Sequence, residues 1–276
     1  MTTARIDACF ADLKRQDRAA FVPYVMAGDP DLATTEALLA GLPAVGADLI
    51  ELGFPFSDPM AEGVPIQRAA QRALRAGVTL KKTLTLVARF RKRDRTTPII
   101  LMGYLNNVLN YGFDAFAADA AVAGVDGLIV VDCPPEEAGP LARALDAANL
   151  SLIRLATPTS DEKRLKVISA GTSGFVYYVS VAGVTGQKEA DEATVAPQVA
   201  RVRQAAGLPV AVGFGIRTPE RAAAIARVAD AAVVGSALVD EVARALDENQ
   251  SPVERVLQSA SHLARAVHGA REIVKA

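Results

Sequence analysis

Hydrophobic and polar positions divide the chain into two kinds of segment that follow one another in turn. Short apolar runs rich in Val, Ile and Leu predict buried strands, which we place at residues 20–26, 47–52, 98–102, 127–131, 150–156, 175–179, 209–213 and 231–234. Longer segments with apolar residues three and four positions apart predict amphipathic helices. These segments are residues 6–15, 34–45, 66–75, 80–93, 113–123, 136–148, 161–170, 195–206, 219–227, 236–246 and 252–274.

The regular order of these segments predicts an α/β architecture. Strands that are joined by helical crossovers form a parallel sheet, and eight strand–helix units favour a closed (β/α)8 TIM barrel over an open doubly wound sheet. The first and last helical segments are then extra N-terminal and C-terminal helices. The chain shows no linker, low-complexity tract or shift in composition, so we expect residues 1–276 to form a single domain.

Composition and charge limit the kinds of molecule that the chain is expected to bind. The chain is 51% hydrophobic and 22% charged, with a formal net charge of −1. This balance is typical of a globular protein and argues against a nucleic-acid or membrane-surface partner. We find no apolar segment of signal-peptide length at the N-terminus and no run near the ~20 residues of a membrane span. The two cysteines, Cys9 and Cys133, lack metal-ligand spacing and fit a reduced, cytoplasmic setting.

The segment DLIELGFPFSDPMAEGVPIQ, residues 48–67, carries the first candidate chemistry. Glu51 lies within an apolar run, where a carboxylate is costly unless it has a function. Glycine and proline residues then break the chain, and Glu62 follows in the same long loop. We interpret this as a strand that ends in one acid, with a loop that brings a second acid over it. The alternative is a solvated strand end and an ordinary surface acid.

Glycines at the ends of three neighbouring strands predict an anion site. GVTG (183–186) follows the sixth strand, GFG (213–215) ends the seventh, and Gly235-Ser236 opens the helix after the eighth. Glycine lets backbone N–H groups approach an oxyanion, a helix N-terminus adds a favourable dipole, and phosphate sites in this fold often follow strands seven and eight. These turns contain no Lys or Arg, which indicates a phosphate handle and not phosphoryl transfer. The alternative is a set of ordinary tight turns.

Other reactive residues fit structural roles better. Cys133 follows a strand, but His262 and His268 lie on the last helix, so we expect the cysteine to pack and the histidines to lie at the surface. The basic run at 89–93 is typical of a solvated helix face. No histidine lies near the strand ends, which argues against a Ser-His-Asp catalytic triad and against a catalytic zinc site, since both normally use histidine. Acid/base chemistry by carboxylates on a phosphorylated, otherwise apolar substrate remains.

Five motifs together resemble the tryptophan synthase α subunit family. They are FVPYVMAGDPD (21–31), ELGFPFSDPMAEG (51–63), AGVTG (182–186), GFGI (213–216) and GSALV (235–239), in family order. The resemblance implies a (β/α)8 enzyme that splits indole-3-glycerol phosphate into indole and glyceraldehyde 3-phosphate by a retro-aldol step, without a metal or cofactor in this chain. It also implies a β subunit that carries pyridoxal phosphate, joins indole to serine to give L-tryptophan, and forms an α2β2 heterotetramer with this chain.

The same resemblance implies roles for individual residues. Glu51 matches the general acid/base, which protonates indole C3 and then accepts the proton of the glycerol hydroxyl. Glu62 matches the second catalytic acid, which stabilises the cationic ring nitrogen. Residues that match the indole pocket are Tyr24, Met102, Tyr104, Ile129 and Tyr177. Residues that match the phosphate site are Gly186, Gly213, Gly215, Gly235 and Ser236, and Thr185 matches a loop residue that helps to close the site.

Three positions depart from the family pattern. Most members have Asp where this chain has Glu62. Their proline more often directly follows the glycine that is Gly63 here, whereas Val64 stands between Gly63 and Pro65 in this chain. Both changes bear on where the loop places its carboxylate. Val181 stands where some members carry Arg, which removes one polar contact of that loop.

Two other functions were weighed against this one. One is another phosphate-binding barrel, such as a phosphosugar isomerase or a thiamin-phosphate-type synthase, which needs a different set of acids and bases. The other is a degenerate α-like chain that only binds and regulates a β partner. Retention of Glu51 and Glu62 argues against the second, because drift tends to erase an acid that is held at energetic cost. Indole release by the isolated chain distinguishes them.

Overall fold

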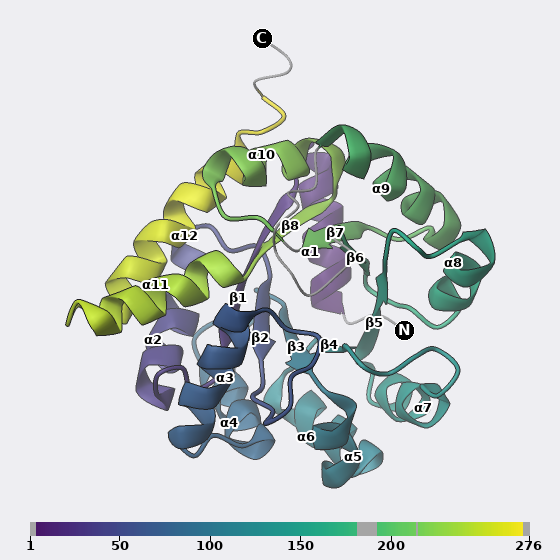
Figure 1. Cartoon of the computed structure of the whole chain (residues 1–276). Coiled ribbons are helices and arrows are strands. Elements are labelled where there is room, and N and C mark those ends of the chain that lie inside the picture. Colours follow the sequence, from purple (N-terminus) through teal and green to yellow (C-terminus); the bar gives the residue numbers. More distant parts are fainter. Residues whose placement is uncertain (1–3, 181–191, 214, 273–276) are drawn as a thin grey trace.

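A closed barrel of parallel strands forms the centre of the molecule (Figure 1). The computed structural model describes residues 4–180, 192–213 and 215–272. Within these residues, eight strands pair in chain order, and β8 closes the barrel against β1. The predicted (β/α)8 TIM barrel is therefore confirmed. The strands are β1 (Ala20–Met26), β2 (Ile50–Gly53), β3 (Ile99–Gly103), β4 (Gly127–Val130), β5 (Ser151–Ala156), β6 (Val176–Val179), β7 (Val210–Gly213) and β8 (Ala231–Val234).

Helices surround the strands on the outside of the barrel (Figure 1). In the described part of the chain they are α1 (Ala4–Arg15), α2 (Leu32–Gly41), α3 (Val64–Arg75), α4 (Leu80–Arg91), α5 (Leu105–Tyr111), α6 (Phe113–Ala123), α7 (Gly139–Ala147), α8 (Glu162–Ser169), α9 (Glu192–Ala206), α10 (Pro219–Val228), α11 (Ser236–Asp247) and α12 (Pro252–His268). A 3-10 turn, η1 (Pro43–Val45), follows α2. None of the described helices is long and apolar enough to cross a bilayer.

The first and last helices do not belong to the repeating strand–helix units and pack against the barrel as additions to it. Helix α1 buries Ile6, Phe10 and Leu13, and the rings of Phe10 and Phe175, just before β6, lie 5.7 Å apart between centroids. Helix α1 therefore packs at the amino ends of the strands. Helix α12 packs on α10, α11, α2 and β1. The two extra helices predicted at the chain ends are thus present, although the last one ends at His268 and not at residue 274.

The lower rim of the barrel, at the amino ends of the strands, repeats one hydrogen-bond pattern. The Asp48 N–H donates to the Phe21 carbonyl at 3.0 Å, and the Phe21 N–H donates to the Asp48 carboxylate at 2.8 Å. The same exchange joins Asp126 to Ile99, Ser173 to Leu152 and Asp230 to Val210. In each case the residue ahead of an even-numbered strand holds the start of the preceding odd-numbered strand. This pattern fixes the register at the face of the barrel where sequence serves stability.

Arginines neutralise the three rim aspartates. Asp126 lies between Arg5 on α1 and Arg91 on α4, at 2.7 and 2.6 Å, and Asp230 accepts from Arg203 on α9. These contacts give the Asp126 carboxylate, which is fully buried, two charged partners. The rim thereby ties helices from different units to the strands.

Asp48 also corrects one expectation about the histidines. The Nε2 atom of His268 lies 2.9 Å from Asp48 Oδ2, and Arg18 donates to both oxygens of the same carboxylate. Burial raises the pKa of Asp48, but hydrogen bonds from His268, Arg18 and the Phe21 N–H outweigh it and bring the pKa below its usual value. His268 is therefore half-buried and holds the end of α12 to the rim, whereas His262 is exposed as expected.

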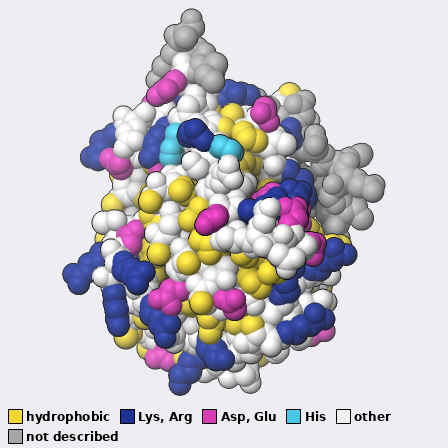
Figure 2. Space-filling view, turned by 90° about the vertical axis from the view of Figure 1, so that its left-hand side faces the viewer, with side chains coloured by type: hydrophobic (Ala, Val, Ile, Leu, Met, Phe, Trp, Pro, Cys, Tyr) yellow, Lys and Arg dark blue, Asp and Glu magenta, His cyan; other side chains and the backbone are white. Residues whose placement is uncertain are grey.

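The outer face that carries the final helices has mixed character. Figure 2 shows positive, negative and hydrophobic side chains interspersed on this face, with histidine side chains at its surface. No large field of one sign appears in this view, which agrees with the formal net charge of −1.

Candidate active site

The first candidate carboxylate lies inside the barrel wall. Glu51 is the second residue of β2, in register with Tyr24 on β1 and Ile100 on β3. The sequence predicted Glu51 at the end of its strand, whereas in the structure two further residues of β2 follow it. Because side chains alternate along a strand, Glu51 faces the interior while its neighbours Ile50 and Leu52 face outward. Only 2% of the residue is exposed, and its Oε1 atom is buried without a hydrogen-bond partner among the described residues.

The second carboxylate is held over the first by the loop between β2 and α3. Glu62 is 8% exposed, so the loop turns this acid inward and not toward solvent. The structure brings Glu51 and Glu62 together closely enough for their charges to interact. The expectation that a long loop covers the strand with a second acid is therefore met in the geometry.

The apolar residues of the same loop divide between inside and outside. Phe54 is buried because Gly103 on β3 has no side chain, and a Cβ there would overlap the Phe54 ring. Met60 and Val64 are 76% and 56% exposed. Phe54 is therefore packed inside, whereas Met60 on the loop and Val64 at the start of α3 lie at the surface.

Burial sets the protonation of both acids. Burial, and secondly the charge of Glu62, raises the pKa of Glu51 from 4.5 to about 8. Burial alone raises the pKa of Glu62 to about 7. Charged carboxylates are disfavoured away from water, and two that share a site disfavour each other's ionisation. Near neutral pH the pair therefore holds a proton on Glu51 and loses one first from Glu62, which is the combination that an acid catalyst beside a stabilising anion requires.

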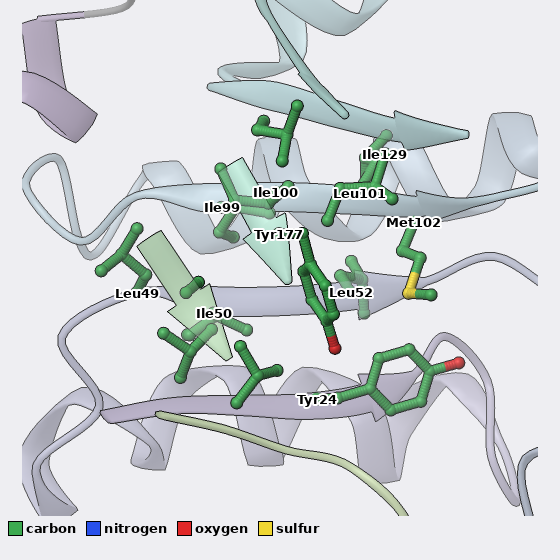
Figure 3. Close-up of a cluster of buried hydrophobic side chains, with 14 of the residues drawn as sticks. Tyr24, Leu49, Ile50, Leu52, Ile99, Ile100, Leu101, Met102, Ile129 and Tyr177 are labelled. Atoms are coloured by element: carbon green, nitrogen blue, oxygen red, sulfur yellow. The ribbon is translucent and has the colours of Figure 1, made fainter. Parts of the chain in front are cut away.

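Five side chains that were matched to the indole pocket gather around this pair. Each is at most 6% exposed, and Figure 3 shows Tyr24, Met102, Ile129 and Tyr177, which lie on β1, β3, β4 and β6. Tyr104 follows β3 directly. The pocket wall is aromatic and aliphatic, which suits a flat apolar ring. These residues are Tyr24, Met102, Tyr104, Ile129 and Tyr177.

Two inward-facing glycines leave space for tyrosine hydroxyl groups. A Cβ on Gly53 would overlap the hydroxyl of Tyr24, and a Cβ on Gly213 would overlap that of Tyr177. The role of Gly53 was not predicted from the sequence, although its position two residues after Glu51 on the same strand placed it on the same face. Gly213 was matched to the phosphate site, and in the structure its missing side chain also leaves space for the Tyr177 hydroxyl.

The remaining glycines lie where β7 and β8 end. Gly215 has φ +76°, a conformation that side chains rarely adopt. Gly235 precedes α11, which begins at Ser236, and makes no side-chain cap hydrogen bond to the first N–H groups of that helix. Since β7 and β8 are neighbours in the barrel, these turns adjoin each other. Thr185 and Gly186 lie outside the described residues.

The other reactive groups stay apart from this site. Cys133 is half-buried, and burial, followed by the charge of Asp132, raises its pKa, so the thiol lacks the activation of a nucleophile. Within the described ranges, no group of three or more His, Cys, Asp or Glu side chains is arranged to hold a metal ion.

Comparison with known families decides the identity. A model of the family described as "Tryptophan synthase alpha chain" matches residues 10–268. The chain belongs to the tryptophan synthase alpha chain family. Curated relatives include the alpha chains of Phenylobacterium zucineum (strain HLK1) and Caulobacter sp. (strain K31), each 70% identical over 271 residues, with 98% of both chains covered.

Solved structures of tryptophan synthase alpha chains share the fold. The alpha subunit from Legionella pneumophila str. Paris superimposes with a TM-score of 0.90 at 41% identity, covering 97% of this chain and 98% of that one. A chain of Mycobacterium tuberculosis tryptophan synthase gives 0.85 at 38% identity, covering 96% and 98%. The chain therefore acts as the tryptophan synthase alpha subunit: it cleaves indole-3-glycerol phosphate to indole and glyceraldehyde 3-phosphate and works with a beta subunit that receives the indole.

Proposed function

We propose that Glu51 and Glu62 perform the acid/base chemistry of the alpha reaction in this chain. The observation that carries the proposal is the burial of two interacting carboxyl groups in the barrel interior, with the pKa raised to about 8 for Glu51 and about 7 for Glu62. Perturbed acids of this kind mark functional sites, because a buried acid without a partner destabilises the fold.

The first step makes the indole ring ready to leave. Glu51, protonated near neutral pH, gives its proton to indole C3. Positive charge then moves to the ring nitrogen, where the ionised carboxylate of Glu62 stabilises it in a site of low dielectric. Because Glu62 has the lower pKa of the two, it can be charged while Glu51 still holds its proton.

The second step breaks the carbon–carbon bond. The Glu51 carboxylate accepts the proton of the hydroxyl on the carbon that is bonded to C3. The C–O bond becomes the carbonyl of glyceraldehyde 3-phosphate, the bond to C3 breaks, and its electron pair returns to the ring. Neutral indole is restored with its N–H intact, and Glu51 is again protonated, so the cycle closes without a redox step.

The remaining residues bind the two ends of the substrate. We assign the indole ring to the wall formed by Tyr24, Met102, Tyr104, Ile129 and Tyr177. We assign the phosphate to Gly186, Gly213, Gly215, Gly235 and Ser236, with Thr185 helping to close the site. Burial of both acids supports the first assignment, and the adjoining turns of β7 and β8 with the open start of α11 support the second.

We propose five further properties of this chain and its partner. We propose that residues 1–276 form one domain and that this chain uses no cofactor of its own. We propose that its beta partner carries pyridoxal phosphate and that the two form an α2β2 heterotetramer in the cytoplasm. The continuous barrel, in which β8 pairs with β1, supports the single domain.

The decisive experiment replaces Glu51 by Gln and measures indole release from indole-3-glycerol phosphate. Glutamine keeps the shape and loses the proton donor, so we expect turnover to fall by about 10²-fold or more, with binding of a non-cleavable substrate analogue retained. Glu62→Ala should also lower turnover strongly, whereas Glu62→Asp should keep measurable activity because it retains a carboxylate. Turnover of Glu51→Gln above about a tenth of the wild-type value contradicts the assignment.

A further inference from the structure

One side chain holds both halves of the loop that carries Glu62. The Tyr104 hydroxyl accepts a hydrogen bond from the Ala61 N–H at 3.0 Å. Its ring also stacks on Phe56, with centroids 5.1 Å apart and planes 27° from parallel. Phe56 lies near the start of the loop and Ala61 directly precedes Glu62, so Tyr104 spans the loop from one end to the other.

The flanking contacts hold the loop ends, and two backbone hydrogen bonds shape its middle from within: the Met60 N–H donates to the Asp58 carbonyl at 2.9 Å and the Glu62 N–H donates to the Pro59 carbonyl at 3.1 Å. Asn107 on α5 donates to the Pro55 carbonyl at 3.2 Å, and Gln67 on α3 donates to the Glu62 carbonyl at 2.9 Å. Between these anchors, Met60 is 76% exposed and gains little from burial. The Ala61 hydrogen bond is thus the contact with the barrel wall that lies closest to Glu62 on its N-terminal side.

The chemistry of Tyr104 suits such a contact. The residue is 3% exposed, and burial, followed by the charge of Glu62, raises its pKa. The hydroxyl therefore stays protonated: it accepts from Ala61 and keeps its own hydrogen. An N–H group that loses its acceptor beside a buried carboxyl group gains by moving to water, and this movement would carry Glu62 outward.

We propose that Tyr104 is a positioning residue that holds Glu62 in the barrel interior through the Ala61 N–H. This inference rests on the proposed role of Glu62 and assigns Tyr104 a task beyond lining the indole pocket. The loop alternates between a held and a released arrangement, and only the held one places the carboxylate beside the ring nitrogen. The population of the held arrangement sets the fraction of productive encounters.

Tyr104→Phe separates this role from that of a pocket wall. Phenylalanine keeps the ring, the stack on Phe56 and the apolar contact with indole, and removes only the acceptor. A single neutral hydrogen bond corresponds to about a threefold to tenfold change in a population. We therefore expect kcat to fall about threefold to tenfold with little change in KM. If Tyr104 only lined the pocket, this variant would leave both kcat and KM unchanged, because the ring is retained.

The test combines amide exchange with kinetics on the full chain. Hydrogen exchange at the Ala61 amide, followed by NMR, should accelerate by about the same factor in Tyr104→Phe, because the released arrangement exposes this N–H. Tyr111→Phe is the matched control: it removes a tyrosine hydroxyl that bonds Asp119 on α6 and should leave Ala61 exchange and kcat at wild-type values.

Two results overturn the inference. Unchanged Ala61 exchange in folded Tyr104→Phe means that the hydrogen bond does not hold the loop. Faster exchange with unchanged kcat means that the loop is held but that its release does not matter to turnover. Neither result depends on the proposed catalytic role, which fails separately if Glu62→Ala turns over at the wild-type rate.

Discussion

At the scale of single residues, the central feature is an acid that the fold keeps uncharged. Glu51 is fully enclosed, and its Oε1 atom has no hydrogen-bond partner among the described residues. An unsatisfied buried polar atom costs about 1–3 kcal/mol. Stability alone would favour an apolar residue at this strand position, so the acid is explained by its chemistry.

Because burial disfavours the charged form of Glu51, the stability of the folded chain should depend on pH. The unfolded chain releases the Glu51 proton above pH 4.5, whereas the folded chain keeps it until the pKa of about 8. A raised carboxyl pKa contributes stability that is present below the unfolded value and is lost as the pH rises toward the folded value. Glutamine does not titrate, so Glu51→Gln should gain stability over wild type by a few kcal/mol between pH 4.5 and pH 8.

Urea unfolding of wild type and Glu51→Gln at a series of pH values measures this gain. A constant difference between wild type and Glu51→Gln across the pH range would mean that Glu51 is ionised in the folded protein.

At the scale of elements, the hydrophobic pattern predicted those strands and helices whose limits depend on nearby residues. The limits of β1 and β8 match the apolar runs, because buried parallel strands are apolar on both faces. Helix α5 was missed: its sequence LNNVLNY is short and rich in Asn, a weak helix former, and its start is fixed by Asp132, which accepts from the Leu105 N–H at 2.7 Å. That partner lies beyond the next strand and leaves no local signal.

Long-range contacts explain the other differences. The second strand begins at Ile50 and not at Ala47, since Asp48 uses its side chain in the lower rim. The last helix ends at His268 because Arg271 turns away to bond the carbonyls of Ala226 and Ala229. The inward position of Glu62 depends on Tyr104, which lies far along the sequence. The motifs indicated candidate site residues, and the apolar run around Glu51 indicated its burial, but the long-range partners of these residues could not be predicted from the sequence.

The phosphate turns give a prediction at this scale. A Cβ on Gly235 would lie 3.4 Å from Tyr24 Cβ, an ordinary contact, so Gly235→Ala should fold and block close approach of phosphate to the backbone. We expect KM for indole-3-glycerol phosphate to rise about tenfold or more, with little effect on an analogue that lacks phosphate. Gly213→Ala displaces the Tyr177 hydroxyl and should weaken both ligands; equal weakening of both by Gly235→Ala would contradict its phosphate role.

At the scale of the whole molecule, the barrel separates stability from chemistry. Charged pairs fasten the amino ends of the strands, where Asp48, Asp126 and Asp230 bind arginines and strand N–H groups. Glu62 and the glycine turns lie beyond the carboxyl ends of β2, β7 and β8. This division lets the rim hold the register while the loops above it carry acids that a stable core would not tolerate.

We predict that the beta subunit docks on the loop side of the barrel. Met60 on the loop of Glu62 and Val64 at the start of α3 are exposed, and a docked beta subunit that covers them would favour the held arrangement. We predict that a cognate beta subunit raises the rate of glyceraldehyde 3-phosphate formation at least tenfold. Reversing the charge of exposed Asp58 (Asp58→Lys) should weaken this stimulation and change the basal rate much less. A flat titration with binding verified independently would refute the coupling.

The most direct test of the account is a carbon-13 NMR titration of the carboxyl groups in the folded chain, with signals assigned through Glu51→Gln and Glu62→Gln. We predict two coupled carboxyl titrations, with apparent pKa values near 8 and near 7, the higher one lost in Glu51→Gln. Titration of both groups near the ordinary value of 4.5 would contradict the claim that the fold holds a proton on Glu51 for transfer to the substrate.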